Sequence, residues 1–146
     1  MRRDRSLWPM HGQPNIIVAN HTSLLDGPAL AWLTPWPILF GVDSAYAHHP
    51  VWSKMLLGYA RLIGTGCEMV PMTPGSVQGL RTLARRLEAG GWVCLFPEGG
   101  IGTGQSYPGV DWLAGRTSAP VHRLHICTIG FGKYRWPYRI EPDFLG

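Results

Sequence analysis

The stretch IIVANHTSLLD, at residues 16–26, decides the fold. Its first four residues are apolar and mostly β-branched, which is typical of a buried strand. The residues that follow place His21 five positions before Asp26. If the strand leads into a helix, the turn between them can fold the Asp26 carboxylate back onto the imidazole. That contact would fix one ring nitrogen as a donor and leave the other free to accept a proton, as a general base requires.

Similar apolar runs recur along the chain, at residues 38–42, 69–72, 92–96 and 124–129. Segments with helical spacing lie between them, and the clearest predicts a helix over residues 76–89. A second helix is expected over residues 45–62. This alternation predicts an α/β fold, with a mostly parallel or mixed sheet flanked by helices. One layered domain over residues 1–146 is the simplest division of the chain.

The composition narrows the possible partners and the compartment. The 13 basic residues exceed the 9 acidic ones, giving a net charge of +4, and the arginines are scattered along the chain. This mild excess suits anionic membrane surfaces or phosphorylated substrates. No nucleic-acid-binding module accompanies it, so no nucleic-acid partner is expected. The three cysteines, Cys67, Cys94 and Cys127, are widely spaced, which favours reduced thiols in a cytoplasmic protein over disulfides or a metal site.

No apolar stretch reaches the roughly 18 residues that a membrane-spanning helix needs. The nearest candidate, residues 27–42, is uncharged but interrupted by prolines. Its Trp32 and Trp36 suit a membrane interface, where indole rings are favoured. A buried helix–turn–strand segment explains the same residues equally well.

A second motif, FPEGG at residues 96–100, follows the apolar run at 92–96. Pro97 stops that strand from continuing its ladder, and Glu98 then opens a glycine-containing loop at the carboxyl end of the strand. Ligands of α/β sheets bind at that edge. Because the first motif also follows a strand, the two motifs would meet at one edge if both strands run parallel.

Together the two motifs resemble those of the glycerolipid acyltransferase family, which includes the lysophospholipid and glycerol-3-phosphate acyltransferases. The resemblance rests on the His-x4-Asp arrangement of His21 and Asp26, and on Phe-Pro-Glu-Gly beginning at Phe96 about 70 residues later. It spans roughly residues 15–130. The family usually carries helices or a membrane anchor before the histidine motif, whereas only about 14 residues precede the first strand here.

The resemblance implies that His21, oriented by Asp26, removes the proton from an acceptor hydroxyl, which then attacks the thioester of acyl-CoA or acyl carrier protein. It implies no bound cofactor and no metal, because the thioester donor is a co-substrate. Ser23 would add a hydrogen bond at the turn, and we expect Asn20 to brace that turn. The substrate-binding residues implied in this way are Ser23, Phe96, Pro97, Glu98, Gly99 and Gly100.

Two departures from the family pattern bear on the acceptor. The family often has a Gly-x-x-Phe-x-x-Arg motif whose arginine meets the acceptor phosphate, and residues 66–72 place Met72 at that position. The usual Thr-Arg-Ser after the second motif is also absent. Residues 69–74, 101–106 and 109–113 resemble instead the acyltransferase part of the 2-acylglycerophosphoethanolamine acyltransferases. The acceptor phosphate in that branch is a diester, so loss of an arginine that grips a phosphate monoester is coherent.

The sequence thus predicts an O-acyltransferase that acylates a lysophospholipid or related glycerol-phosphate lipid, located on the cytoplasmic face of a membrane as a peripheral protein. Two alternatives remain open. The chain would be a weakly active or non-catalytic lipid-binding domain if it kept only the fold. It would be a thioesterase or esterase if water replaced the acceptor alcohol at the same base.

Overall fold

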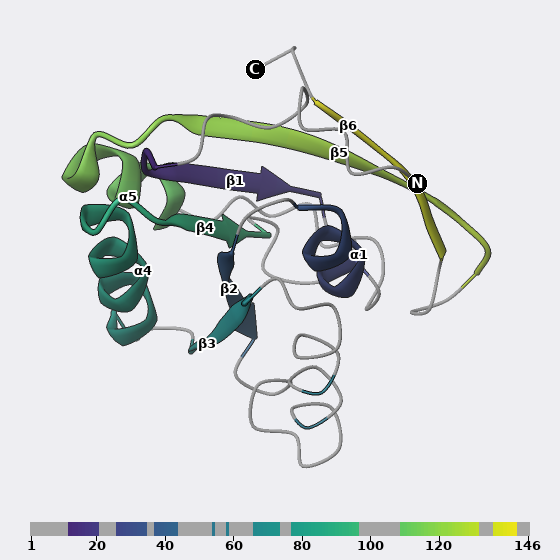
Figure 1. Ribbon diagram of the computed structural model, residues 1–146, viewed down its shortest axis with the longest axis horizontal. Helices are drawn as coiled ribbons and strands as arrows, with labels where there is room; N and C mark the ends of the chain where they lie inside the picture. The colour runs from purple at the N-terminus through teal and green to yellow at the C-terminus, as the bar shows by residue number, and fades with distance from the viewer. Residues whose placement is uncertain are drawn as a thin grey trace.

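The computed structural model describes residues 12–20, 26–34, 37–43, 54, 58, 66–73, 77–96, 109–131 and 136–142. The helices and strands follow one another along the chain in the order drawn in Figure 1. They are β1 (Asn15–Ala19), α1 (Asp26–Leu33), β2 (Ile38–Asp43), β3 (Glu68–Met72), α4 (Gln78–Glu88), β4 (Trp92–Leu95), α5 (Gly109–Thr117), β5 (Val121–Ile129) and β6 (Trp136–Pro142). Of the helix expected over residues 45–62, Lys54 and Gly58 lie within the described residues, and both are helical.

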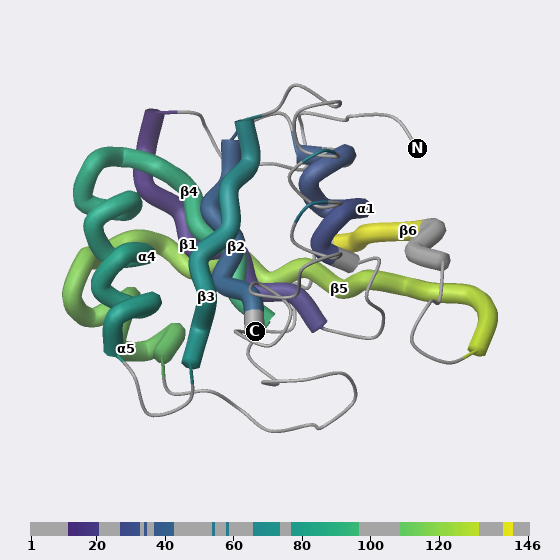
Figure 2. The backbone as a smooth tube through the Cα atoms, turned by 90° about the horizontal axis from the view of Figure 1, so that it is seen from below, coloured from purple at the N-terminus to yellow at the C-terminus, as the bar shows by residue number. Residues whose placement is uncertain are grey.

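The strands form one sheet of six, in the order β3-β2-β4-β1-β5-β6. Every neighbouring pair from β3 to β5 is parallel, and β6 alone is antiparallel, at the edge beside β5. The expected α/β class with a mostly parallel sheet is therefore confirmed. Figures 1 and 2 show β1 near the middle of the twisted sheet and β3 and β6 at its two edges.

Both faces of the sheet are covered, which explains why β1 and β4 read as continuous apolar runs. Along β1, Ile16 and Val18 belong to the core on one face, and Ile17 and Ala19 to the core on the other. Helices α4 and α5 contribute Leu83, Leu87 and Leu113 to the first core. Helix α1 contributes Leu30 and Ala31 to the second. The domain is thus a three-layer sandwich (Figure 1).

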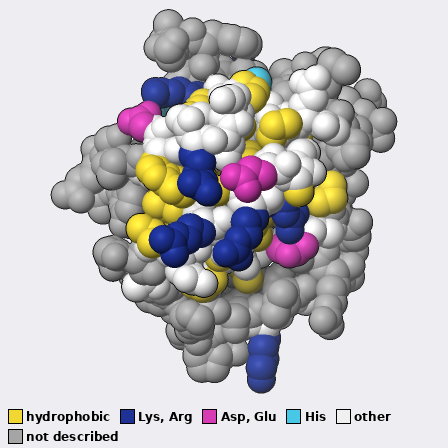
Figure 3. All heavy atoms as spheres, turned by 90° about the vertical axis from the view of Figure 1, so that its left-hand side faces the viewer, with side chains coloured by type: hydrophobic (Ala, Val, Ile, Leu, Met, Phe, Trp, Pro, Cys, Tyr) yellow, Lys and Arg dark blue, Asp and Glu magenta, His cyan; other side chains and the backbone are white. Residues whose placement is uncertain are grey.

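Helix α4 buries a stripe formed by Gly79, Leu83, Ala84 and Leu87. Val77, an apolar residue within the range 76–89 predicted as a helix, precedes α4 and is 53% exposed. The opposite face of α4 is charged. Figure 3 shows this side of the molecule, where basic and acidic side chains are interleaved over α4 and α5. Within the described residues these include the ion pairs Arg86–Glu68 (3.1 Å) and Arg116–Glu88 (3.6 Å).

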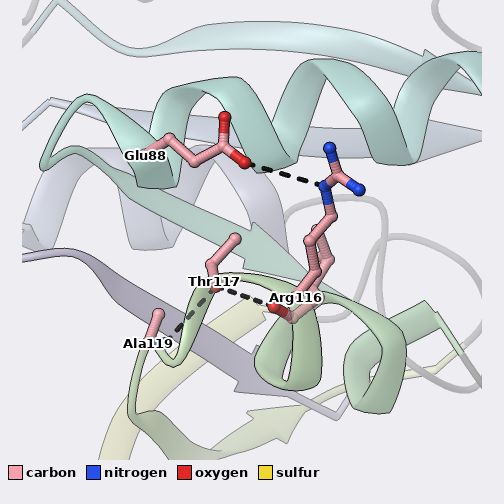
Figure 4. Close-up of polar contacts among 5 residues, drawn as sticks. Glu88, Arg116, Thr117 and Ala119 are labelled. Atoms are coloured by element: carbon pink, nitrogen blue, oxygen red, sulfur yellow. Dashed lines mark hydrogen bonds and ion pairs between the residues drawn. The ribbon is translucent and has the colours of Figure 1, made fainter.

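The end of α5 is fixed by Thr117, whose hydroxyl donates to the Leu113 carbonyl (2.7 Å) and accepts from the Ala119 amide (3.3 Å), as drawn in Figure 4. Ser118 between them has φ +56°, a left-handed conformation that stops the helix. The chain therefore turns sharply from α5 into β5. The adjacent Arg116–Glu88 pair is exposed on both sides and contributes little.

The hairpin of β5 and β6 extends beyond the rest of the sheet. Pairing between β1 and β5 ends at Ala19 and Leu124, whereas β5 continues to Ile129. β5 has five further residues after Leu124, and a strand rises about 3.3 Å per residue, so the hairpin extends about 16 Å past the end of β1. The register between β5 and β6 shifts between Cys127 and Thr128, next to Pro137. Proline is tolerated at such an irregular edge position.

Candidate functional site at the carboxyl ends of β1 and β4

The two strands that precede the sequence motifs are direct neighbours. β1 and β4 pair in parallel, with Ile17 opposite Cys94 and Val18 opposite Leu95. Asn20 follows β1 and Phe96 follows β4, so the chain leaves both strands at the same edge of the sheet, just before residues 21–25 and 97–100 in the sequence. The expectation that the two strands run parallel is confirmed.

The connections that leave these two neighbouring strands cover opposite faces of the sheet. The chain leaves β1 for α1, which covers one face, and returns to the sheet at β2. It leaves β4 for α5, which covers the opposite face, and returns at β5 on the other side of β1. Open α/β sheets bind their ligands just outside the carboxyl ends of two strands related in this way. The topology therefore points to the same edge as the motifs.

Most of the predicted site residues lie outside the described residues: His21, Ser23, Pro97, Glu98, Gly99 and Gly100. Asp26 is the first residue of α1. Phe96 directly follows β4, is partly buried, and packs against the core on the α1 face. These positions put one end of each motif at the carboxyl edge, and the roles of the side chains stay predictions.

Asn20, the residue before His21, makes a polar contact through both ends of its side-chain amide at this edge. Its side-chain Oδ1 accepts a hydrogen bond from the Ile126 amide of β5 (2.6 Å), and its Nδ2 donates to the Ile126 carbonyl (3.0 Å). Ile126 is 1% exposed, so each of these backbone groups would cost about 1–3 kcal/mol if left without a partner. We expected Asn20 to brace its own turn, and residues 21–25 of that turn lie outside the described residues. The contact with Ile126 joins residues 106 positions apart, which no local pattern could reveal.

A second asparagine occupies the other end of β1. Asn15 is 2% exposed. Its Nδ2 donates to the Gln13 carbonyl (3.0 Å), and its Oδ1 lies 2.9 Å from Nε2 of His122. Since the amide nitrogen is committed to Gln13, Nε2 of His122 is the donor in that contact. Burial lowers the pKa of His122 below its ordinary value. This pair lies at the amino end of β1, away from the motif edge.

Met72, which stands where the family motif has arginine, is partly buried and packs against the core. It ends β3 and contacts the core on the α4 face. A Cβ atom added to Gly41 of β2 would lie 3.1 Å from its Cγ, and one added to Gly79 of α4 would lie 2.5 Å from its Sδ. The Met72 side chain therefore fills a slot that two glycines leave open, a position unsuited to an arginine that binds phosphate.

The three cysteines are free thiols, as expected, and Cys67 and Cys94 are buried. Burial raises the pKa of the Cys94 thiol, with a smaller contribution from Cys67, so Cys94 is neutral at physiological pH. Neither the pKa nor the burial of Cys94 suits a nucleophile. Across the described ranges, no three His, Cys, Asp or Glu side chains cluster as metal ligands would.

The fold and this edge define an α/β domain with a strand-end site at two adjacent parallel strands whose outgoing connections cover opposite faces of the sheet. A sequence model of the Acyltransferase family matches residues 4–123, which run from before β1 to the third residue of β5 and include both motifs. The match covers most of the 146-residue chain. The chain belongs to the Acyltransferase family and is an acyltransferase.

Proposed function

We propose that the protein transfers a fatty acyl group from a thioester donor to the hydroxyl of a lysophospholipid, with His21 as the general base and Asp26 as its partner. The single observation that carries this proposal is the parallel pairing of β1 with β4. That pairing starts the segment with His21 and the segment with Glu98 from adjacent strand ends. The family match supports acyl transfer as the reaction class.

The proposed step needs a base more than it needs an acid. An alcohol has a pKa far above 7, so its proton must move to His21 as the oxygen attacks the thioester carbonyl. The carbon–oxygen bond of the new ester forms and the carbon–sulfur bond breaks. The thiolate of coenzyme A or of acyl carrier protein leaves and takes up the proton that His21 holds, which gives the free thiol. Neither a covalent enzyme intermediate nor a bound cofactor enters this balance.

The acceptor we propose carries a phosphodiester head group, as in lysophosphatidylethanolamine. The support is the position of Met72, which fills the slot beside Gly41 and Gly79. Arginine binds a phosphate monoester through paired, charge-assisted hydrogen bonds, and a thioether cannot replace them. An acceptor whose phosphate carries one charge fewer depends less on such a contact.

We also propose that the chain acts at an anionic membrane surface on the cytoplasmic side. No helix in the described part of the chain is both long and apolar enough to cross a bilayer. The β5–β6 hairpin offers another contact: Ile129 is 66% exposed and Phe131 is 96% exposed. The hairpin projects past the same edge from which His21 follows β1, and Lys133 and Arg135 follow in the sequence. Apolar side chains flanked by basic ones favour anionic interfaces.

The activity test combines two readouts on purified protein with acyl-CoA or acyl carrier protein as donor. Acylated product is measured by mass spectrometry, and free thiol is measured in the presence and absence of lysophosphatidylethanolamine. Thiol release that requires the acceptor and disappears in His21→Ala supports transfer. Thiol release that ignores the acceptor supports a thioesterase. No turnover of either kind, with binding to liposomes retained, supports the lipid-binding alternative.

The membrane proposal is tested by sedimentation with vesicles of phosphatidylethanolamine and phosphatidylglycerol. Ile129→Ser and Phe131→Ser should weaken binding, while Val121→Ser should not. Val121 is a matched control because it is 38% exposed and lies at the opposite end of β5. Equal binding by all three variants would refute a contact through the hairpin.

A further inference from the structure

The backbone of β5 presents a regular series of polar groups to β1, and a side chain completes that series. The Ile16 amide donates to the Pro120 carbonyl (3.0 Å). Backbone groups alternate in direction along a strand, so the backbone N–H and C=O groups present at residues 120, 122, 124 and 126 point towards β1. Backbone pairing of the two strands ends at Ala19 and Leu124. The next pair of groups belongs to Ile126, and the Asn20 side chain takes both.

Asparagine is suited to this position because its amide carries a donor and an acceptor side by side. Turning the amide over would set Nδ2 against the Ile126 amide and Oδ1 against its carbonyl, which would break both bonds. The contact therefore fixes the orientation of the Asn20 side chain. It extends the link between β1 and β5 to Asn20, the residue that is directly bonded to His21 in the chain.

We propose that Asn20 is a positioning residue for acyl transfer: its side chain fixes the end of β1 to Ile126 of β5 and thereby sets the position from which His21 reaches the acceptor hydroxyl. The inference rests on the proposed role of His21 as the base. Consecutive Cα atoms are about 3.8 Å apart, so a shift at Asn20 is passed to His21 almost undiminished. A misplacement of about 1 Å at a reacting group can cost about 100-fold in rate.

The test compares Asn20→Ala with Asn15→Ala. Asn15 is the same residue type at the opposite end of β1; it is more deeply buried than Asn20 and is likewise bonded through both ends of its amide. It lies at the far end of β1, so its loss should lower the melting temperature without reaching the site. We expect Asn20→Ala to lower kcat by roughly 10- to 100-fold, with KM changed less than about threefold. We expect Asn15→Ala to keep kcat within about twofold of the original.

Two further readouts separate positioning from stability. Asn20→Asp keeps an acceptor for the Ile126 amide but sets a carboxylate oxygen against the Ile126 carbonyl, so we expect it to lose kcat even if Asn20→Ala does not fold. The acid limb of the profile of kcat/KM against pH reports the base. A carboxylate partner raises the pKa of an imidazole, so the Asn20 variants should move that limb to lower pH, towards the ordinary histidine value of about 6.5.

The outcomes distinguish this inference from the proposed function. If His21→Ala keeps full activity, the proposed base is wrong and the inference fails with it. If His21→Ala is inactive but the folded Asn20 variants match Asn15→Ala in kcat and in pH profile, the base stands and the positioning role of Asn20 is overturned. A selective loss of kcat in the Asn20 variants, with the acid limb displaced to lower pH, supports it.

Discussion

Substitution of Gly79 by alanine tests how closely α4 approaches β3, and with it the position of Met72. A Cβ atom on Gly79 would lie 2.8 Å from the Pro71 carbonyl oxygen and 2.5 Å from Sδ of Met72. The sulfur can move with its side chain, but the carbonyl belongs to the backbone of a strand. Reaching ordinary contact near 3.4 Å therefore requires α4 to move away from β3 by about 0.6 Å.

The expected cost follows from two opposing effects. Overpacking a core costs about 1–3 kcal/mol. Replacing glycine by alanine in a helix gains at most about 1 kcal/mol, and less at Gly79 because it is the second residue of α4. The net result is a loss of about 1–2 kcal/mol, or roughly 3–8 °C in melting temperature for a chain of this length. Urea denaturation followed by circular dichroism measures the free energy of unfolding.

Gly115 of α5 provides the matched control. It is helical and exposed, and a Cβ atom there would meet nothing within 4 Å. Gly115→Ala should therefore stabilise the protein by about 0.5–1 kcal/mol. If Gly79→Ala were as stable as Gly115→Ala, the close contact of α4 with β3 would be refuted. The Met72 side chain would then not fill the space beside Gly79.

Three further predictions concern His122, Met72 and Cys94. Burial lowers the pKa of His122, so as pH falls His122 takes up its proton in the unfolded chain before it does so in the folded protein. The stability that neutral His122 contributes is therefore complete above about pH 6.5 and is lost as pH falls below it. His122→Gln should flatten the dependence of the free energy of unfolding in urea on pH between 7.5 and 5. Met72→Arg should destabilise the fold by about 1–3 kcal/mol without adding activity towards lysophosphatidic acid, and a tenfold gain in that activity would contradict the packed position. Burial raises the pKa of the Cys94 thiol, so Cys94 should react with a maleimide only when the protein unfolds. The half-buried Cys127 should react in the native state, and mass spectrometry of labelled peptides would show the difference.

The sequence was sufficient to predict the strands whose residues are apolar on both faces. β1, β2 and β4 begin and end within one residue of the expected runs, because full burial leaves an uninterrupted apolar signal. β5 begins at Val121, three residues before the predicted start. Its early residues include His122 and Arg123, which break the apolar run, and His122 is accommodated by Asn15.

The edge strand β6 was not predicted, because Pro137 and Pro142 argue against a strand in a sequence. Its place at the edge, beside an irregular step in the register, makes both prolines acceptable. The contact of Asn20 with Ile126 could not be predicted for a different reason. It depends on the order of strands in the sheet, and the motif itself specifies only residues near one another in sequence.

The central claim is that the histidine following β1 is the base for acyl transfer. It is tested most directly by the single-turnover rate of transfer from acyl-CoA to lysophosphatidylethanolamine, measured for the original protein and for His21→Ala at the same pH and temperature. We predict a loss of about 100- to 10,000-fold, the range that a positioned base contributes, with the melting temperature unchanged. An unchanged rate in a folded His21→Ala protein would contradict the claim.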